Sequence, residues 1–318
     1  MMPKLDFGQL TYNNQTILMK VPVITDPFKT IMVSVSGGSD SDIVVDMCER
    51  MIKDKTKLHY VYFDTGLEYK ATKEHLLFLE DKYSISIERV KAIKSIPHTA
   101  KEYGQPFISK HVSEMCYRLQ KYNFEWNDDP YQELIKDYPN CESALKWWTN
   151  YYDNGSSFNI SRNKMLKEFM VDNPPWFKIS AKCCEYAKKR VASEYEKEYE
   201  IDLSVNGMRK AEGGVRSTRY SSCFDKKDSV SQYRIIYNMT DQDKINYTQV
   251  AHIENSDCYT KYGLLRTGCA GCPFSKNLEM ERQVIANFEP TLLKAVENTF
   301  RDSYEYTKMY REYVKEFS

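Results

Sequence analysis

The segment Ile31–Met47 constrains the fold of this chain more than any other stretch. It reads IMVSVSGGSDSDIVVDM. The apolar run at its start predicts a buried strand, and the apolar residues at its end recur at helical spacing. The serine, glycine and aspartate residues between them predict a tight turn into a helix. A strand, a glycine turn and a helix in direct succession are typical of α/β domains with a parallel sheet.

The residues of this turn are suited to binding an anion. Gly37 and Gly38 allow a close approach to the backbone, because they lack a Cβ. The hydroxyls of Ser36, Ser39 and Ser41 can point at the same spot as the first N–H groups of the helix. Such a nest binds phosphate, helped by the helix dipole. The lysine of a Walker A loop is absent. A plain turn without a ligand is the alternative.

Two further strands are expected nearby, at Leu58–Phe63 and Ser84–Val90, with helical spacing over residues 69–83. Repeated strand–helix units predict a parallel sheet, whose ligands lie at the carboxyl ends of the strands. The turn DTGLE at residues 64–68 would then share an edge with the glycine turn. Asp64 could cap the next helix, or it could contact a nucleotide or Mg²⁺.

We expect the chain to divide into three segments. Residues 1–28 are predicted to form a β-hairpin, because QLTYNNQTILMKVP alternates around two asparagines. Residues 29–275 form the α/β domain, with an aromatic-rich helical insertion at 95–180. Residues 276–318 form a C-terminal helical extension, which could pack on the domain or form a homodimer. The aromatic residues predict a helical core, and base stacking in nucleic acid is the alternative.

Composition argues against some classes of protein. The 45 basic residues balance 45 acidic ones, which disfavours a protein that coats nucleic acid. No apolar run is long enough for a membrane span, and no secretory signal is recognisable, so we expect a cytoplasmic protein without a membrane partner. Nine cysteines, several of them clustered, then favour metal binding or thiol chemistry over disulfides.

Four cysteines form two pairs, Cys183-Cys184 and the CAGC turn of Cys269 and Cys272, separated by 84 residues (185–268). Four thiolates can hold zinc or an iron–sulfur cluster. Adjacent side chains diverge, which suits the separate irons of a [4Fe–4S] cube better than a single zinc. Buried or redox-active thiols are the third possibility.

Two arginines follow a predicted strand at Ile201–Val205, in the stretch NGMRKAEGGVR. Guanidinium groups bind phosphate or sulfate in a bidentate manner. Arg209 and Arg216 come directly after the strand, so we expect anion binding rather than surface ion pairs. Lys110, which opens a helix after the loop QPFIS, could also reach a phosphate or sulfate, or lie on the surface.

Taken together, these segments resemble the phosphoadenylyl-sulfate (PAPS) reductase family of PP-loop ATP pyrophosphatases. The likeness rests on the SGGSDS loop, the DTG turn, the double cysteine, the GMRKAE stretch and the CAGC turn, in that order. It implies a Rossmann-like α/β fold of the adenine nucleotide α-hydrolase type. The nucleotide-binding residues that it implies are Ser36, Gly37, Gly38, Ser39, Asp40, Ser41, Asp64, Thr65, Gly66, Arg209, Glu212, Arg216 and Lys110. Of these, Ser36, Asp40, Ser41 and Arg209 would be catalytic, and Cys183, Cys184, Cys269 and Cys272 would ligate a [4Fe–4S] cluster.

The chain departs from the reductases of this family, because no cysteine follows Cys272, where they carry a nucleophilic thiol. We therefore expect cleavage of ATP, with Mg²⁺, between the α- and β-phosphates, coupled to sulfur transfer. The resemblance leaves DNA, tRNA or a small molecule as the acceptor, and a cysteine desulfurase as a possible sulfur donor. One alternative is an adenylyl-sulfate or PAPS reductase that uses an internal cysteine. Another is a non-catalytic nucleotide- or nucleic-acid-binding component of a modification or defence system.

Overall fold

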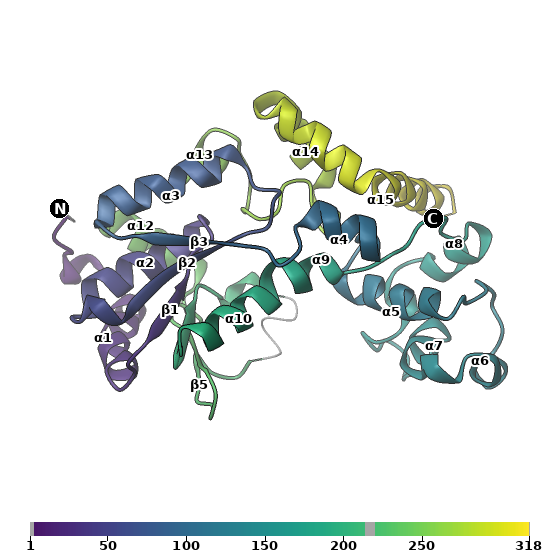
Figure 1. Cartoon of the computed structure of the whole chain (residues 1–318), viewed down its shortest axis with the longest axis horizontal. Helices are drawn as coiled ribbons and strands as arrows, with labels where there is room; N and C mark the ends of the chain where they lie inside the picture. The colour runs from purple at the N-terminus through teal and green to yellow at the C-terminus, as the bar shows by residue number, and fades with distance from the viewer. Residues whose placement is uncertain (1–2, 214–219, 318) are drawn as a thin grey trace. The chain divides into compact units, whose positions relative to one another are not determined.

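The computed structural model describes residues 3–213 and 220–317, which form two compact units (Figure 1). Unit 1 comprises Met1–Ile93 and Ala187–Ala270, and unit 2 comprises Lys94–Tyr186 and Gly271–Ser318. Each unit is therefore built from two separate stretches of chain. The division into three segments made from the sequence stays a prediction.

Unit 1 contains a six-stranded sheet in the order β3-β2-β1-β4-β6-β5. All neighbouring strands are parallel except β5 and β6, which are antiparallel. The strands are β1 (Ile31–Ser34), β2 (Leu58–Asp64), β3 (Ile87–Lys91), β4 (Leu203–Asn206), β5 (Phe224–Asp225) and β6 (Ser231–Arg234). The predicted α/β architecture with a parallel sheet is confirmed, and β1 lies between β2 and β4.

Helices cover both faces of this sheet, because successive side chains of a strand point to opposite faces. Val33 and Val205 belong to a core shared with α1, α2, α3 and α12, whereas Met32 and Val61 pack with Tyr195 of α10 on the other face. The helices of unit 1 are α1 (Tyr12–Thr25), α2 (Ser39–Met51), α3 (Lys70–Tyr83), α10 (Arg190–Glu198), α12 (Asp241–Val250) and α13 (Asp257–Thr260). Burial on both faces explains why the strands read as continuous apolar runs.

The predicted N-terminal β-hairpin is wrong, because residues 12–25 form helix α1. Thr11 caps this helix by accepting a hydrogen bond from the backbone N–H of Asn14. The side chains of Ile17, Leu18 and Val21 are buried at helical spacing. The Asn14 side chain donates to the backbone carbonyl of Asp243 in α12. The stretch around the two asparagines, which suggested a turn, therefore forms a capped helix start and a contact with α12.

Asp243 joins the start of α12 to the start of α1. Its carboxylate accepts hydrogen bonds from the Thr11 and Thr240 hydroxyls, both at 2.7 Å, and from the Asn13 amide at 2.7 Å. Burial alone would raise the pKa of Asp243, but these hydrogen bonds outweigh it and lower the pKa to about 2. The charged carboxylate therefore fixes the position of α12 against α1.

Unit 2 is helical, with an aromatic core. Its helices are α4 (Ile96–Tyr103), α5 (Lys110–Lys121), α6 (Tyr131–Asp137), α7 (Glu142–Trp148), α8 (Leu166–Asp172), α9 (Lys182–Cys184), α14 (Leu278–Phe288) and α15 (Pro290–Glu316). Trp147, Trp148 and Phe169 are fully buried in this core, together with Tyr306 of α15. The expected helical insertion and C-terminal helices are confirmed, as is the aromatic core within the insertion. A π-helical stretch, Glu185–Lys189, follows α9.

Among the described residues, no helix combines the length and the apolar character that crossing a membrane requires.

Candidate functional site

The loop between β1 and α2 is closed by one buried serine side chain. Ser41 Oγ accepts hydrogen bonds from the backbone N–H groups of Ser36 and Gly38, both at 3.2 Å, and donates to the Gly38 carbonyl at 2.8 Å. The Ser36 hydroxyl lies 3.1 Å from the same atom. Gly38 is the residue that caps α2, so the loop is folded tightly against the first turn of that helix. Ser36, Gly38 and Ser41 are therefore brought together, as the sequence suggested.

One glycine of the loop is required by its backbone conformation. Gly37 has a φ of +65°, a conformation that side chains with a Cβ rarely adopt, and a Cβ there would lie 2.9 Å from Thr72 Cγ2. Gly38 has an ordinary φ of −100°, and a Cβ there would lie 2.7 Å from the side-chain atom Thr267 Oγ1. A larger residue at position 38 would therefore displace the Thr267 side chain.

Two cations meet the same carboxylate oxygen at the first turn of α2. Arg209 Nε lies 3.0 Å from Asp40 Oδ1, and Lys244 Nζ lies 2.8 Å from the same oxygen. Lys244 Nζ also donates to Ser39 Oγ at 2.7 Å. Arg209 follows β4, which pairs with β1, and its second contact is Asp241 Oδ1 at 2.8 Å. The arginine, aspartate and serines selected from the sequence therefore belong to one cluster.

The arginine of this cluster is almost completely buried, with 6% of its surface exposed. Burial alone would lower the pKa of Arg209, but its hydrogen bond to Asp241 and the charges of Asp40 and Asp241 raise it. Its backbone N–H donates to Glu212 Oε2 at 3.2 Å, so Glu212 holds the turn that carries the arginine. The guanidinium is charged and fixed in place.

The DTGLE turn after β2 holds a pair of carboxyl groups. Glu68 accepts from the backbone N–H of Thr65 at 2.7 Å and from that of Gly66 at 3.1 Å. Asp64 Oδ1 accepts from Gly66 N at 2.9 Å, and Asp64 does not cap α3, whose N-cap is Tyr69. Burial, followed by the hydrogen bond to Asp64, raises the pKa of Glu68. The helix-cap alternative is excluded, and two carboxyl groups lie at the end of β2.

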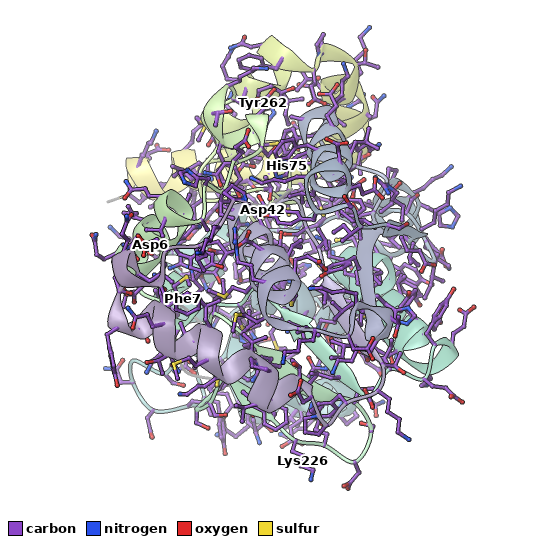
Figure 2. The ribbon with its side chains drawn as sticks, turned by 90° about the vertical axis from the view of Figure 1, so that its left-hand side faces the viewer. Asp6, Phe7, Asp42, His75, Lys226 and Tyr262 are labelled. Carbon is purple, nitrogen blue, oxygen red and sulfur yellow. The ribbon has the colours of Figure 1, made fainter. Side chains whose placement is uncertain are left out.

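A buried hydrogen bond between His75 and Asp42 anchors the helix that follows the loop. His75 Nε2 of α3 lies 2.8 Å from Asp42 Oδ2 of α2, and both side chains are buried. Figure 2 labels the two residues, which lie close to each other on neighbouring helices. Burial raises the pKa of Asp42 more than the hydrogen bond with His75 lowers it. The pair fixes α2, and with it the loop, to α3.

The other predicted site residues are distributed over both units, and one of them is not described. Cys269 belongs to unit 1, where the Thr65 hydroxyl lies 3.6 Å from its Sγ. Cys183, Cys184 and Cys272 belong to unit 2, as does Lys110, an exposed residue at the start of α5. Arg216 lies outside the described residues.

Within the described parts of the chain, no group of three or more His, Cys, Asp or Glu side chains is arranged to hold a metal ion. The fit of the four cysteines to a cluster is thus not shown, and the cluster stays a prediction.

Three residues at the loop were not selected from the sequence. Lys244 is 205 residues away from Ser39, and no motif marks it. Tyr259 OH accepts from the backbone N–H groups of Ser39, at 3.2 Å, and Thr267, at 3.3 Å. Glu68 could have been selected, because it is the last residue of the DTGLE motif.

Residues 30–144 match the model of the family described as the phosphoadenosine phosphosulfate reductase domain. These residues are therefore similar to a PAPS reductase domain. The matched residues include the loop Ser36–Ser41 and the DTGLE turn, whereas Arg209 and Lys244 lie beyond them. The match thus bears out, for residues 30–144, the resemblance to this family that the sequence predicted.

A curated protein is also similar to part of this chain. The NH₃-dependent NAD⁺ synthetase of Wolinella succinogenes is 24% identical over 135 residues, which are 42% of this chain and 51% of that protein. The chain thus spans about half the length of this curated relative.

Two solved structures are also similar. PAPS reductase from Candida auris in complex with phosphate has a TM-score of 0.44 at 11% identity, over 85% of this chain and 98% of that one. The U34-tRNA thiolase NcsA of Methanococcus maripaludis with its [4Fe–4S] cluster has a TM-score of 0.39 at 11% identity, over 95% and 79%. Both TM-scores lie under 0.5, below the level at which such a likeness establishes a shared fold.

Proposed function

We propose that this protein binds ATP at the loop Ser36–Ser41 and cleaves it between the α- and β-phosphates, so that an acceptor becomes adenylylated. The observation that carries the proposal is the meeting of the loop, the buried Arg209 and Lys244 at the carboxyl ends of neighbouring parallel strands. That edge is where α/β sheets bind their ligands. The name of the matched family refers to an adenine nucleotide, which supports this class of ligand.

The loop and its arginine have separate tasks in this reaction. The acceptor attacks the α-phosphorus, a bond to the acceptor forms, and the bond to the bridging oxygen breaks with its electron pair on pyrophosphate. The hydroxyls of the loop and the positive end of the α2 dipole hold the departing pyrophosphate. Arg209 stabilises the negative charge that develops on it, and Asp40 positions Arg209 through their 3.0 Å ion pair. Ser41, which is buried, is a positioning residue that keeps the loop closed.

The carboxyl pair at the end of β2 fits a magnesium ion. Mg²⁺ in nucleotide sites is bound by one or two carboxylates together with substrate phosphates. Asp64 and Glu68 supply such oxygens at the same sheet edge as the loop, because β1 and β2 are parallel neighbours. They would hold the ion, which when bound neutralises charge on the phosphate oxygens.

The purified protein with ATP and Mg²⁺ should release pyrophosphate when plausible acceptors are added, and Ser36→Ala should lower this rate about tenfold to a hundredfold. The Ser36 hydroxyl lies at the loop on an exposed residue and can bind phosphate directly. Pyrophosphate is measured with a coupled enzymatic assay, and Ser221→Ala, an exposed serine elsewhere in unit 1, serves as the control.

Other outcomes favour the alternatives. Consumption of adenylyl sulfate or PAPS with sulfite release, and no pyrophosphate from ATP, would assign a reductase. Tight nucleotide binding without turnover by any acceptor, together with unchanged properties of Ser36→Ala, would assign a non-catalytic component.

The finer part of the proposal is that adenylylation is coupled to sulfur transfer through an iron–sulfur cluster on Cys183, Cys184, Cys269 and Cys272. Its support is the spacing of the two pairs in the sequence. Protein purified without oxygen should contain about four irons and four acid-labile sulfides per chain, and serine at any of the four positions should remove them. Cys223→Ser is the control, because this cysteine belongs to neither pair. Zinc, or iron that survives all four substitutions, would refute the cluster.

A further inference from the structure

We propose that Lys244 is a phosphate-binding residue that contacts the pyrophosphate portion of the nucleotide, an inference that rests on the function proposed above. Lys244 comes from α12, far in sequence from the loop, yet its ammonium lies 2.7 Å from Ser39 Oγ and 2.8 Å from Asp40 Oδ1. It supplies at this loop the lysine that the loop sequence lacks.

Two cations at the loop share one carboxylate oxygen. Arg209 and Lys244 both contact Asp40 Oδ1, and their side chains are 8% and 23% exposed. Asp241, which also contacts Arg209, is 77% exposed, so water screens its charge strongly. The exposed Glu212 and the buried Asp42 also interact electrostatically with Arg209 and Lys244, respectively. Asp42 is hydrogen-bonded to His75, and an anion at the loop would meet two largely buried cations that share Asp40.

The position of the two cations at the start of α2 also favours the binding of an anion. Ser39 and Asp40 are the first two residues of α2, at the positive end of its dipole. Cations are unfavourable at that end unless an anion is also present. Asp40 and Asp42, the two acidic residues of the first turn, compensate part of this cost, and a bound polyphosphate would compensate the rest.

The backbone that carries Lys244 is held in place. Its neighbour Asp243 is fixed by three hydrogen bonds of 2.7 Å, from Thr11, Asn13 and Thr240. The ammonium itself ends a flexible four-carbon stem, so it can turn from Asp40 toward a ligand without movement of the helix. The backbone of Lys244 is therefore fixed, whereas its ammonium group can move toward a ligand.

This arrangement suits a ligand with several negative charges. Pyrophosphate and ATP carry more charge at their phosphates than AMP or adenylyl sulfate does, and the attraction grows with the product of the charges. Lys244 should therefore favour ATP and pyrophosphate over the ligands with a single phosphate.

The test compares the dissociation constants of pyrophosphate, ATP, adenylyl sulfate and AMP by calorimetry at constant ionic strength. Lys244→Gln should weaken the binding of pyrophosphate and ATP about tenfold to a hundredfold, and that of AMP and adenylyl sulfate less than threefold. Lys244→Arg should restore most of the loss, because it keeps the charge. Lys70→Gln, which alters an exposed lysine paired with Glu74 on α3, is the matched control.

A second measurement uses the unmodified protein. Pyrophosphate should protect Lys244 from acetylation by an N-hydroxysuccinimide ester at least fivefold, as read by mass spectrometry, whereas AMP should not. The acetylation of Lys70 should be the same with either ligand.

The outcomes separate this inference from the proposed function. If the wild type binds ATP and Lys244→Gln binds it equally well, the role of Lys244 is overturned, whereas the proposed function is not affected. Equal losses for ATP and AMP, or no protection by pyrophosphate, would overturn its assignment to the pyrophosphate group. A wild-type protein that binds none of the four ligands would refute the proposed function and this inference with it.

Discussion

Arg209→Met should reduce pyrophosphate release from ATP by about a hundredfold to a thousandfold. The buried guanidinium is aimed at the loop by Asp40, at 3.0 Å, and by Asp241, at 2.8 Å. A fixed, desolvated donor contributes most where negative charge develops in the transition state, and removal of one such donor has effects of this size. The methionine keeps much of the side-chain volume, so the measured loss reports the charge. Turnover is measured as pyrophosphate released per folded molecule.

Arg234→Met is the matched control for this prediction. Arg234 is equally buried, ends the neighbouring strand β6, and pairs with Asp225 at 2.5 Å. Its loss should lower stability but leave the turnover of the folded protein within about threefold of the wild type. Similar turnover losses in both variants would mean that Arg209 acts only through the fold.

Asp46→Ala should lower the free energy of unfolding by about 3–5 kcal/mol, the cost of removing one partner from a buried charged pair. Asp46 of α2 is fully buried and accepts hydrogen bonds from Arg50 Nε at 2.7 Å, from Tyr247 OH at 2.7 Å and from Tyr83 OH at 3.0 Å. The substitution would leave one guanidinium and two hydroxyls without their acceptor. Urea unfolding at neutral pH measures the change.

Two milder variants serve as controls for Asp46. Tyr83→Phe and Tyr247→Phe each remove one donor while the carboxylate keeps its pairing with Arg50, so each should cost about 1 kcal/mol. A loss in Asp46→Ala no larger than in these variants would show that the three-way contact does not hold α2 in place.

Much of unit 1 could be predicted from the sequence, because its signals are local. The apolar runs of β1 and β2, the glycine turn and the helical spacing after it depend on neighbours along the chain. The parallel sheet follows from the succession of these elements. Arg209 could be assigned to the site because it follows a strand, and strands of one parallel sheet end at one edge. The same reasoning placed the carboxylate of Asp64 at that edge.

The errors and omissions have a common physical cause. Residues 12–25 alternate enough to suggest a hairpin, but a cap at Thr11 and hydrogen bonds between Asn14 and α12 stabilise a helix. Lys244 reaches the loop only because α12 packs beside α1 and α2. Spacing along the chain contains no information about such contacts.

The sequence by itself determined the glycine loop between β1 and α2, the parallel sheet and the position of Arg209 after β4. Each depends on residues near one another or on a general rule of chain connection. Only the tertiary structure decided that a second cation, Lys244, joins Arg209 on Asp40, and that Glu68 is buried beside Asp64. The position of Lys244 depends on the packing of α12 beside the loop, and the burial of Glu68 depends on what packs over its turn, neither of which local patterns encode.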